Sequence, residues 1–282
     1  MGFFVFCFVF GCQNNTVTED SGAGAEVLGL SFCQVKTHRL STVDSSTDEN
    51  GVENPDASFE ATFAWDGLFQ TLTAGQFGNF ASQYQSYSAQ YNELGYPLEM
   101  HFDDVVGASM LRSLDVLSEY QCDAWCRLQS QRLEYNHDGD PTIVTYTWDG
   151  LTQYQDGTDY STTYNELGYV LESEFEDQMG LHQIQNTWSC SAEVCLRSSY
   201  DHILNNPMSG DVEILTLTFE EVSTETGNEL QGVGTLNING ESYVYRLDQK
   251  INLHGLPTWE QEERTTMQGT RQMTSMWEYN CP

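Results

Sequence analysis

Hydrophobic and polar positions alternate in short stretches along most of the chain. Residues 59–65 read FEATFAW, in which aromatic or small apolar residues are separated by polar or small ones. The same period of two returns over residues 144–148 (VTYTW) and 215–219 (LTLTF). Such alternation is typical of a β-strand with one buried face. The pattern therefore predicts three similar strands in three successive regions of the chain.

Turn signals follow these strands. An Asp-Gly dipeptide, which favours a tight hairpin, stands at residues 66–67 and again at 149–150. The hexapeptide YNELGY occurs at residues 91–96 and 164–169, and residues 252–257 (NLHGLP) keep an echo of it. We interpret this hexapeptide as a turn of a repeated scaffold rather than a binding motif, because its glycine supplies a conformation that side chains resist.

Six cysteines bracket the repeated pattern. Three of them each follow an aromatic residue by two positions and close a repeat: Cys122, Cys190 and Cys281. The other three open one: Cys33, Cys126 and Cys195. We predict an all-β fold of three consecutive antiparallel β-hairpin modules, over residues 33–122, 123–190 and a degenerate 191–282. Short junctions between them favour an elongated stacked or continuous sheet.

The cysteine brackets predict one disulfide within each module: Cys33–Cys122, Cys126–Cys190 and Cys195–Cys281. The alternative pairs neighbours, Cys122 with Cys126 and Cys190 with Cys195, while Cys33–Cys281 closes the whole chain. An extended strand would separate Cys122 from Cys126 by roughly 13 Å, too far for a disulfide without a tight turn. We therefore favour the first pairing.

Composition excludes some partners. The 282 residues carry a formal net charge of −32, from 42 acidic and 10 basic side chains. Nucleic acid and anionic lipid would repel such a chain, so we predict no nucleic-acid partner. An aromatic content of 12% argues against disorder.

The N-terminus carries an export signal. Residues 3–10 are almost wholly apolar, and Gly11-Cys12 follows, which resembles a bacterial lipobox. We predict a signal peptide over residues 1–11, a lipid on Cys12 and a polar tether over residues 12–32. The alternative is an ordinary cleaved signal in which Cys12 is incidental. Either way the protein is exported, and a lipid would attach it to the outer membrane or cell surface.

The two YNELG stretches resemble the YD repeats of Rhs-type bacterial surface proteins. The core of that repeat is Tyr-Asp, two free residues, then Gly and an apolar position, and here Asn replaces Asp. The resemblance implies β-hairpin repeats and a secreted or cell-surface location. It does not imply a toxin.

Two acidic stretches suggest calcium as the one ionic candidate. Asp48 and Asn50 lie in one of them, and Asp138 and Asp140 lie in the other, at the same place between the first two strands of a module. Both resemble part of an EF-hand-like loop but lack its bidentate glutamate. The alternative is an acidic hairpin turn. We predict no cofactor beyond weakly bound calcium.

Exposed aromatics offer the remaining functional candidate. Residues 74–90 form an insertion in the first module, and four aromatics there could stack on sugar rings or a partner protein: Phe77, Phe80, Tyr84 and Tyr87. The alternative is a longer hairpin whose aromatics pack on its own sheet.

No nucleophile, base and acid stand in a recognisable catalytic arrangement. We therefore predict a non-catalytic surface lipoprotein with a structural or adhesive role, whose partner is a surface glycan or protein. The alternative is a carbohydrate-active protein, either glycan-binding or glycoside-hydrolysing.

Overall fold

The computed structural model describes most of the chain after residue 31. The described residues are 32–45, 57–75, 77–78, 83–105, 111–122, 126–135, 140–177, 180–190, 195–207, 210–224, 227–253, 255–266 and 269–281. They form β-strands joined by turns. No helix among them is long and apolar enough to cross a membrane.

The first segment of the fold, up to Cys122, contains the strands β1 to β7. Their bounds are β1 (Gln34–Asp44), β2 (Ala57–Asp66), β3 (Phe69–Gly75), β4 (Phe77–Gly78), β5 (Gln83–Tyr91), β6 (Pro97–Val105) and β7 (Leu111–Cys122). The two-residue β4 pairs with β5 beside β3.

The second and third segments contain six strands each. Those of the second are β8 (Cys126–Tyr135), β9 (Thr142–Asp149), β10 (Thr152–Gln155), β11 (Ser161–Tyr164), β12 (Val170–Asp177) and β13 (Gly180–Cys190). Those of the third are β14 (Cys195–Asn205), β15 (Val212–Thr224), β16 (Gly227–Ile238), β17 (Glu241–Asn252), β18 (Pro257–Thr266) and β19 (Gly269–Asn280). The three strands predicted from alternation lie within β2, β9 and β15.

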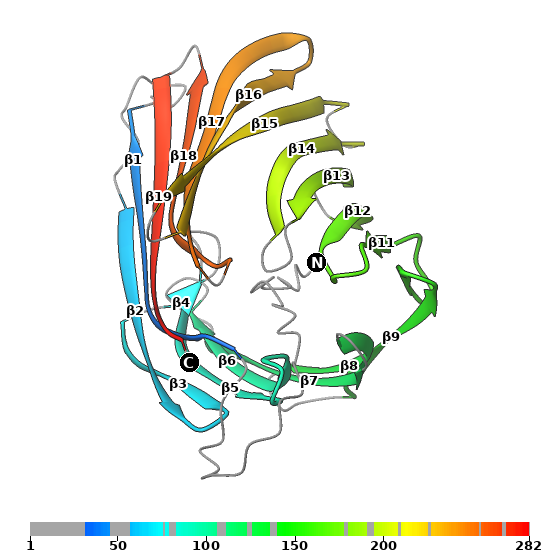
Figure 1. The fold of residues 1–282 in the computed structure, drawn as a ribbon. Helices are drawn as coiled ribbons and strands as arrows, with labels where there is room; N and C mark the ends of the chain where they lie inside the picture. Colours follow the sequence, from blue (N-terminus) through cyan, green and yellow to red (C-terminus); the bar gives the residue numbers. More distant parts are fainter. Residues whose placement is uncertain are drawn as a thin grey trace, which may run out of the picture.

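All strands belong to one antiparallel sheet that closes on itself. Each strand pairs with its neighbour in sequence, and β19 pairs back with β1, so that eighteen strands form a ring when β4 is set aside. Figure 1 shows this closure, with β1 beside β19. The prediction of β-structure is confirmed, and the prediction of an elongated stack is wrong. An elongated stack would leave the outer edges of β1 and β19 unpaired, whereas closure of the ring pairs them with each other.

Residues on each strand alternate between a buried inner face and an outer face. On β1, His38, Leu40 and Thr42 are buried, and Leu40 lies opposite Phe59 of β2. The residues between them project to the other face, where Arg39 lies opposite Glu60. A single closed sheet can bury side chains only on its concave side, so the first set faces the interior.

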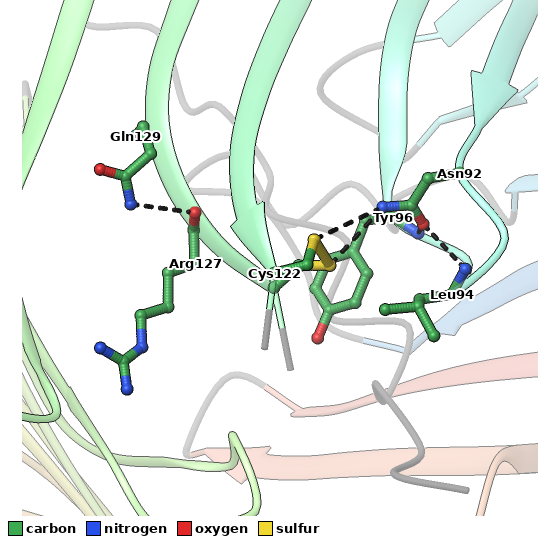
Figure 2. The surroundings of a disulfide bond; sticks show 7 residues. Asn92, Leu94, Tyr96, Cys122, Arg127 and Gln129 are labelled. Carbon is green, nitrogen blue, oxygen red and sulfur yellow. Dashed lines mark hydrogen bonds between the residues drawn. A yellow bond between two sulfur atoms is a disulfide. The ribbon is translucent and has the colours of Figure 1, made fainter. Parts of the chain in front are cut away.

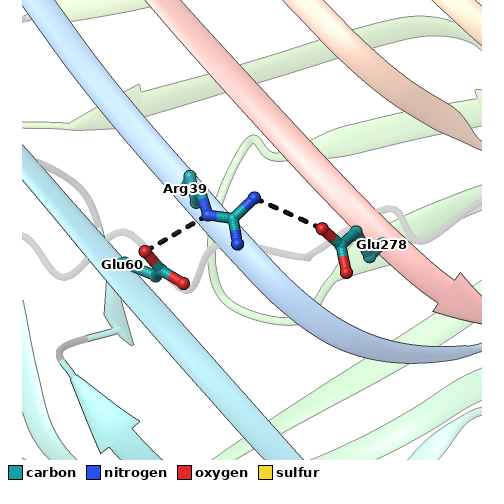
Figure 3. Close-up of polar contacts among 3 residues, drawn as sticks. All are labelled: Arg39, Glu60 and Glu278. Atoms are coloured by element: carbon teal, nitrogen blue, oxygen red, sulfur yellow. Dashed lines mark hydrogen bonds and ion pairs between the residues drawn. The ribbon is translucent and has the colours of Figure 1, made fainter.

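The outer face carries charged and polar pairs between neighbouring strands. Arg39 contacts both Glu60 of β2 and Glu278 of β19, each at 3.2 Å, and so spans the closure of the ring (Figure 3). Further pairs on this face are His101–Asp115, Glu119–Ser130, Glu174–Gln183 and Glu229–Lys250. These pairs are exposed or partly exposed, and each adds little stability in water.

The main buried cluster lies inside the first segment. It packs Phe63, Tyr87, Tyr91 and Phe102 together with Val116 of β7. Hydroxyl groups within it are satisfied, since the Tyr91 hydroxyl donates to Gln70 at 2.8 Å and lies 3.0 Å from the Tyr87 hydroxyl. These two tyrosine hydroxyls therefore need no water to complete their hydrogen bonds.

Candidate functional site

Three disulfides join the segments to one another. They connect Cys122 to Cys126, Cys190 to Cys195, and Cys33 to Cys281. The predicted pairing within modules is therefore wrong, and the alternative pairing is correct. The physical reason is that β7 and β8 are antiparallel neighbours, which brings Cys122 and Cys126 to a Cα–Cα distance of 4.0 Å instead of the span of an extended strand.

Every disulfide lies at the same end of the barrel. Connections alternate between the two ends because neighbouring strands run in opposite directions. The end at which β1 begins and β19 ends also holds the connections β2–β3, β5–β6, β7–β8, β9–β10, β11–β12, β13–β14, β15–β16 and β17–β18. We call this end the disulfide rim.

The repeated turns also lie on the disulfide rim, and they share one hydrogen-bond pattern. In the first, the side-chain oxygen of Asn92 accepts from the amides of Leu94 and Tyr96 at 3.0 and 2.9 Å. The same two bonds occur at Asn165. Asn252 accepts the bond that corresponds to the one from Tyr96, from the amide of Leu256 at 3.0 Å. The glycines of the three turns have φ of +85°, +82° and +76°, a region that disfavours other residues. The prediction of a structural turn is thus confirmed, including its echo in the third segment.

The first turn contacts the neighbouring disulfide directly. The side-chain amide of Asn92 lies 3.5 Å from the sulfur of Cys126 and 3.9 Å from that of Cys122 (Figure 2). Behind it, the ring of Tyr96 packs against Tyr120 at 5.4 Å between centroids. The aromatic residue two positions before each closing cysteine therefore belongs to the packing of this rim.

The corresponding aromatics of the other segments bond to the strand after the turn. The Trp188 indole donates to the carbonyl of Val170 at 2.8 Å, and the Tyr279 hydroxyl donates to that of Pro257 at 2.9 Å. Val170 and Pro257 are the first residues of β12 and β18. The aromatic residue before each of these closing cysteines thus holds the strand that follows the turn by a hydrogen bond. This shared role explains why the pattern recurs.

The inner wall of the third segment is polar and forms the candidate binding surface. Burial raises the pKa of the Glu260 carboxyl, although a hydrogen bond from Gln249 and the charge of Arg197 oppose the rise. Burial lowers the pKa of Arg197, whose guanidinium lies 5.2 Å from the rings of both Trp188 and Tyr200. We call this set, with the residue Tyr245, the polar wall.

Tyrosine hydroxyls complete the polar wall. Burial raises the pKa of both Tyr200 and Tyr245, and the carboxylate of Glu262 raises it further. Glu260 and Glu262 stand two positions apart on β18, so both project to the same face, about 7 Å apart along the strand. Buried carboxyl, guanidinium and phenol groups together suit a ligand rich in hydroxyl groups.

A row of rings continues the inner wall across β12, β13 and β14. Phe175 lies parallel to His182 at 4.7 Å between centroids, and Nδ1 of His182 lies 3.0 Å from Nε2 of His202. Burial and the neighbouring His182 lower the pKa of His202. Within the described residues, no group of three or more metal-ligating side chains occurs.

The structure tests the other predicted site residues unevenly. Cys12, Asp48, Asn50, Asp138 and Phe80 lie outside the described residues. Asp140 is exposed before β9. Phe77 and Tyr84 lie opposite each other on the paired strands β4 and β5.

Tyr87 corrects the prediction of an exposed aromatic loop. It lies on β5, is 5% exposed and packs between Phe63 and Phe102. Its hydroxyl is the partner of Tyr91, so it stabilises the interior of the first segment and is not available to a ligand. The physical reason is period two, since Tyr87, Ala89 and Tyr91 share the inner face.

No protein-family model matches this chain, and no curated protein matches it in sequence. Among solved structures, it is similar to a porin-like protein from Bacteroides uniformis, with 8% identity, 87% of this chain and 98% of that one covered, and a TM-score of 0.30. It is also similar to a porin-like protein from Bacteroides vulgatus, with 7% identity, 88% of this chain and 99% of that one covered, and a TM-score of 0.29. The TcdB2-TccC3-TEV structure has 8% identity, with 82% of this chain and 16% of that one covered, and a TM-score of 0.24. TM-scores this low carry no argument about what this chain does, so its function is argued from its own geometry.

Proposed function

We propose that this protein is a non-catalytic, exported barrel, lipid-anchored at a cell surface, with a structural or adhesive role built on YD-like β repeats. The observation that carries the proposal is the set of three disulfides, which join each segment to the next and the third back to the first. Disulfides form and persist in oxidising compartments. A ring fastened in this way is suited to life outside the cytoplasm.

The outer face supports a location in water beside the membrane, with the strands outside the bilayer. Membrane-spanning barrels carry an apolar band of about 25 Å on their outer face. Here that face carries Arg39, Glu60 and Glu278 across three neighbouring strands, and each of these side chains is more than two-fifths exposed. Attachment through a lipid on Cys12 would hold the protein at the cell surface while its charged outer face stays in water.

Cell fractionation with thiol labelling tests the proposal. We expect the protein in the membrane fraction, with a lipid on Cys12 by mass spectrometry and six cysteines unreactive to alkylation until reduced. Protease added to intact cells should digest it only after reduction opens the ring. Recovery in the cytosol with reactive thiols would overturn the proposal.

The polar wall favours a second candidate, a carbohydrate-active protein. Glu260 has a raised pKa and Glu262 shares its face of β18, and a pair of carboxyls in distinct environments is what glycoside hydrolysis requires. Binding and reducing-sugar release can be measured on a panel of glycans with the wild type and Glu260→Gln. Release abolished by Glu260→Gln, with binding retained, would favour hydrolysis, and binding without release would favour a glycan-binding role.

A further inference from the structure

The disulfide rim presents an exposed leucine in each of its three asparagine–glycine turns. Leu94, Leu167 and Leu253 are 45%, 37% and 68% exposed. The amides of Leu94 and Leu167 each donate to the turn asparagine at 3.0 Å. The leucines therefore stand on ordered turns, one in each segment around the ring. Isolated exposed leucines are ordinary, but a repeated apolar tip at one end of a molecule marks a contact surface.

The rim behind these leucines is amphipathic. Tyr96 and Tyr169 end the first two turns and pack on Tyr120 and Trp188 at 5.4 and 4.9 Å between centroids. Phe69, beside the Asp-Gly turn at the same end, is 41% exposed. Leucine tips backed by tyrosine and tryptophan are the side chains that settle at a boundary between water and an apolar phase.

The chain itself brings this rim to the membrane. Cys33 precedes β1 and is bonded to Cys281 after β19, so the residues before Phe32 attach at the disulfide rim. The inference rests on the proposed function here, because a lipid on Cys12 would tether the barrel by this end. A tether converts a weak contact into an intramolecular one and raises its effective concentration.

The charge of the disulfide rim decides which kind of lipid surface it can contact. The three turns read NELGY, NELGY and NLHGL, which contain two glutamates and no lysine or arginine. An anionic lipid would be repelled, and so would a second copy of a chain whose formal net charge is −32. A zwitterionic headgroup layer carries no net charge and leaves room for Glu93 and Glu166 among the headgroups.

We propose that Leu94, Leu167 and Leu253 dock the disulfide rim onto a zwitterionic lipid surface and hold the barrel upright. The opposite rim then faces away from the membrane. The three-fold placement matters, because three contacts fix an orientation whereas one allows the barrel to tilt.

Hydrogen exchange on the acylated full-length chain tests this proposal. The protein is reconstituted in vesicles of phosphatidylcholine and phosphatidylethanolamine, and exchange is followed in peptides that cover the three turns. The test variant is Leu94→Ser/Leu167→Ser/Leu253→Ser. The matched control changes three residues on the outer face of the strands, Ile143→Ser/Val233→Ser/Val244→Ser, each more than half exposed.

We expect the turn peptides to exchange several-fold more slowly in the wild type and the control than in the test variant. Addition of phosphatidylglycerol should remove much of that protection. Equal exchange in all three proteins would overturn the proposal, and so would protection that persists without lipid and grows with protein concentration, which would indicate a second copy as the partner. Slow exchange of β1 and β19 in every variant verifies that the barrel is folded.

The mass of the N-terminal peptide separates this result from the proposed function. If Cys12 is not acylated, the proposed anchoring fails, and flotation of the unacylated chain with the same vesicles then tests the rim alone. A bound fraction that falls in the test variant but not in the control supports the rim contact, and an unchanged fraction overturns it.

Discussion

The inner walls of the first and third segments are built from different kinds of side chain. In the first segment, aromatic and aliphatic side chains from β1 to β7 form one apolar cluster, which Leu133 of the adjacent β8 joins. In the third, apolar burial is concentrated on β15 and β16, where Leu217 and Leu230 are 1% exposed. The neighbouring strands turn Arg197, Tyr245 and Glu260 inward instead.

The features that the two segments share build the barrel, and the features in which they differ are the candidates for function. With β4 set aside, both segments share six-strand connectivity, a turn at the disulfide rim and bracketing cysteines, so those features build the barrel. The first wall stabilises it by burying apolar area. The third wall places a carboxyl and a guanidinium group, Glu260 and Arg197, where burial penalises their charged forms.

The largest expected effect tests the bond that joins the two walls. Cys33→Ala/Cys281→Ala opens a loop that spans 248 positions, whereas Cys122→Ala/Cys126→Ala opens one of four. The chain-entropy relation gives losses of about 5.5 and about 2 kcal/mol in the free energy of unfolding. Urea unfolding of the two variants measures the difference. Equal losses would mean that the disulfide between the first and third segments contributes no more stability than the local Cys122–Cys126 disulfide.

A core truncation tests the apolar wall. Phe102→Ala should lower the free energy of unfolding by about 3–5 kcal/mol, because Phe102 is buried against Tyr87 and its removal leaves a cavity. Tyr245→Phe in the polar wall keeps the ring and should cost far less. If the two losses match, the proposed division between a stabilising and a functional wall is wrong.

His38 makes the apolar wall sensitive to acid. It stacks on Trp277 with 5.1 Å between centroids, and burial lowers its pKa from 6.5 to about 4. Between those values the unfolded chain binds a proton that the folded chain does not, so stability falls as pH drops through this window, by about 3 kcal/mol in total. His38→Leu should remove that part of the slope. Urea melts of both proteins at pH 7 and pH 4.5 provide the comparison, and parallel slopes would contradict it.

Glu260 should give the polar wall the opposite dependence. Its folded pKa is raised, so the cost of its burial is absent below the unfolded pKa near 4.5 and appears as pH rises through the folded pKa. We expect Glu260→Gln to be as stable as wild type at pH 4 and more stable than wild type at pH 8. Thermal unfolding at the two pH values measures this. A variant that is less stable at pH 8 would show that the charged form is needed by its neighbours.

The smallest effect concerns a feature that both segments share. Asn92→Ala removes an acceptor for the amides of Leu94 and Tyr96, and Asn252→Ala removes an acceptor for the amide of Leu256. We expect a loss of about 1 kcal/mol in each variant. Urea midpoints of the two variants provide the measurement, and a loss several times larger in one of them would show that the two turns are not stabilised by the same hydrogen-bond pattern.

Local sequence patterns predicted the strands and turns but not their closure. Alternation fixed β2, β9 and β15, and the asparagine–glycine spacing fixed the turns, because both depend on residues a few positions apart. The pairing of β1 with β19 joins residues more than 200 positions apart, and no local pattern encodes it. The Cys33–Cys281 disulfide depends on that closure, whereas Cys122–Cys126 and Cys190–Cys195 were misassigned because the antiparallel pairing of β7 with β8 and of β13 with β14 brings those cysteines together.

The polar wall was not predicted because two side chains of β18 face in the directions opposite to those that their hydrophobicity suggests. On β18, hydrophobic patterning would turn Trp259 inward and Glu260 outward. In the structure Trp259 lies opposite Lys250 on the outer face, with the ammonium 5.8 Å from the indole ring, and Glu260 faces the interior. Register with neighbouring strands decided the orientation of these two residues, and register is not visible in one strand's sequence.

The disulfide between Cys33 and Cys281 makes the covalent path of this protein a circle. At the junctions between segments the chain is continuous through both a peptide backbone and a disulfide, and between β19 and β1 it is continuous through the disulfide alone. A single proteolytic cut between Cys122 and Cys126 would therefore release no fragment, because the Cys122–Cys126 and Cys33–Cys281 disulfides would still join the two pieces. A barrel built in this way can lose a peptide bond at a junction and still hold every strand in place.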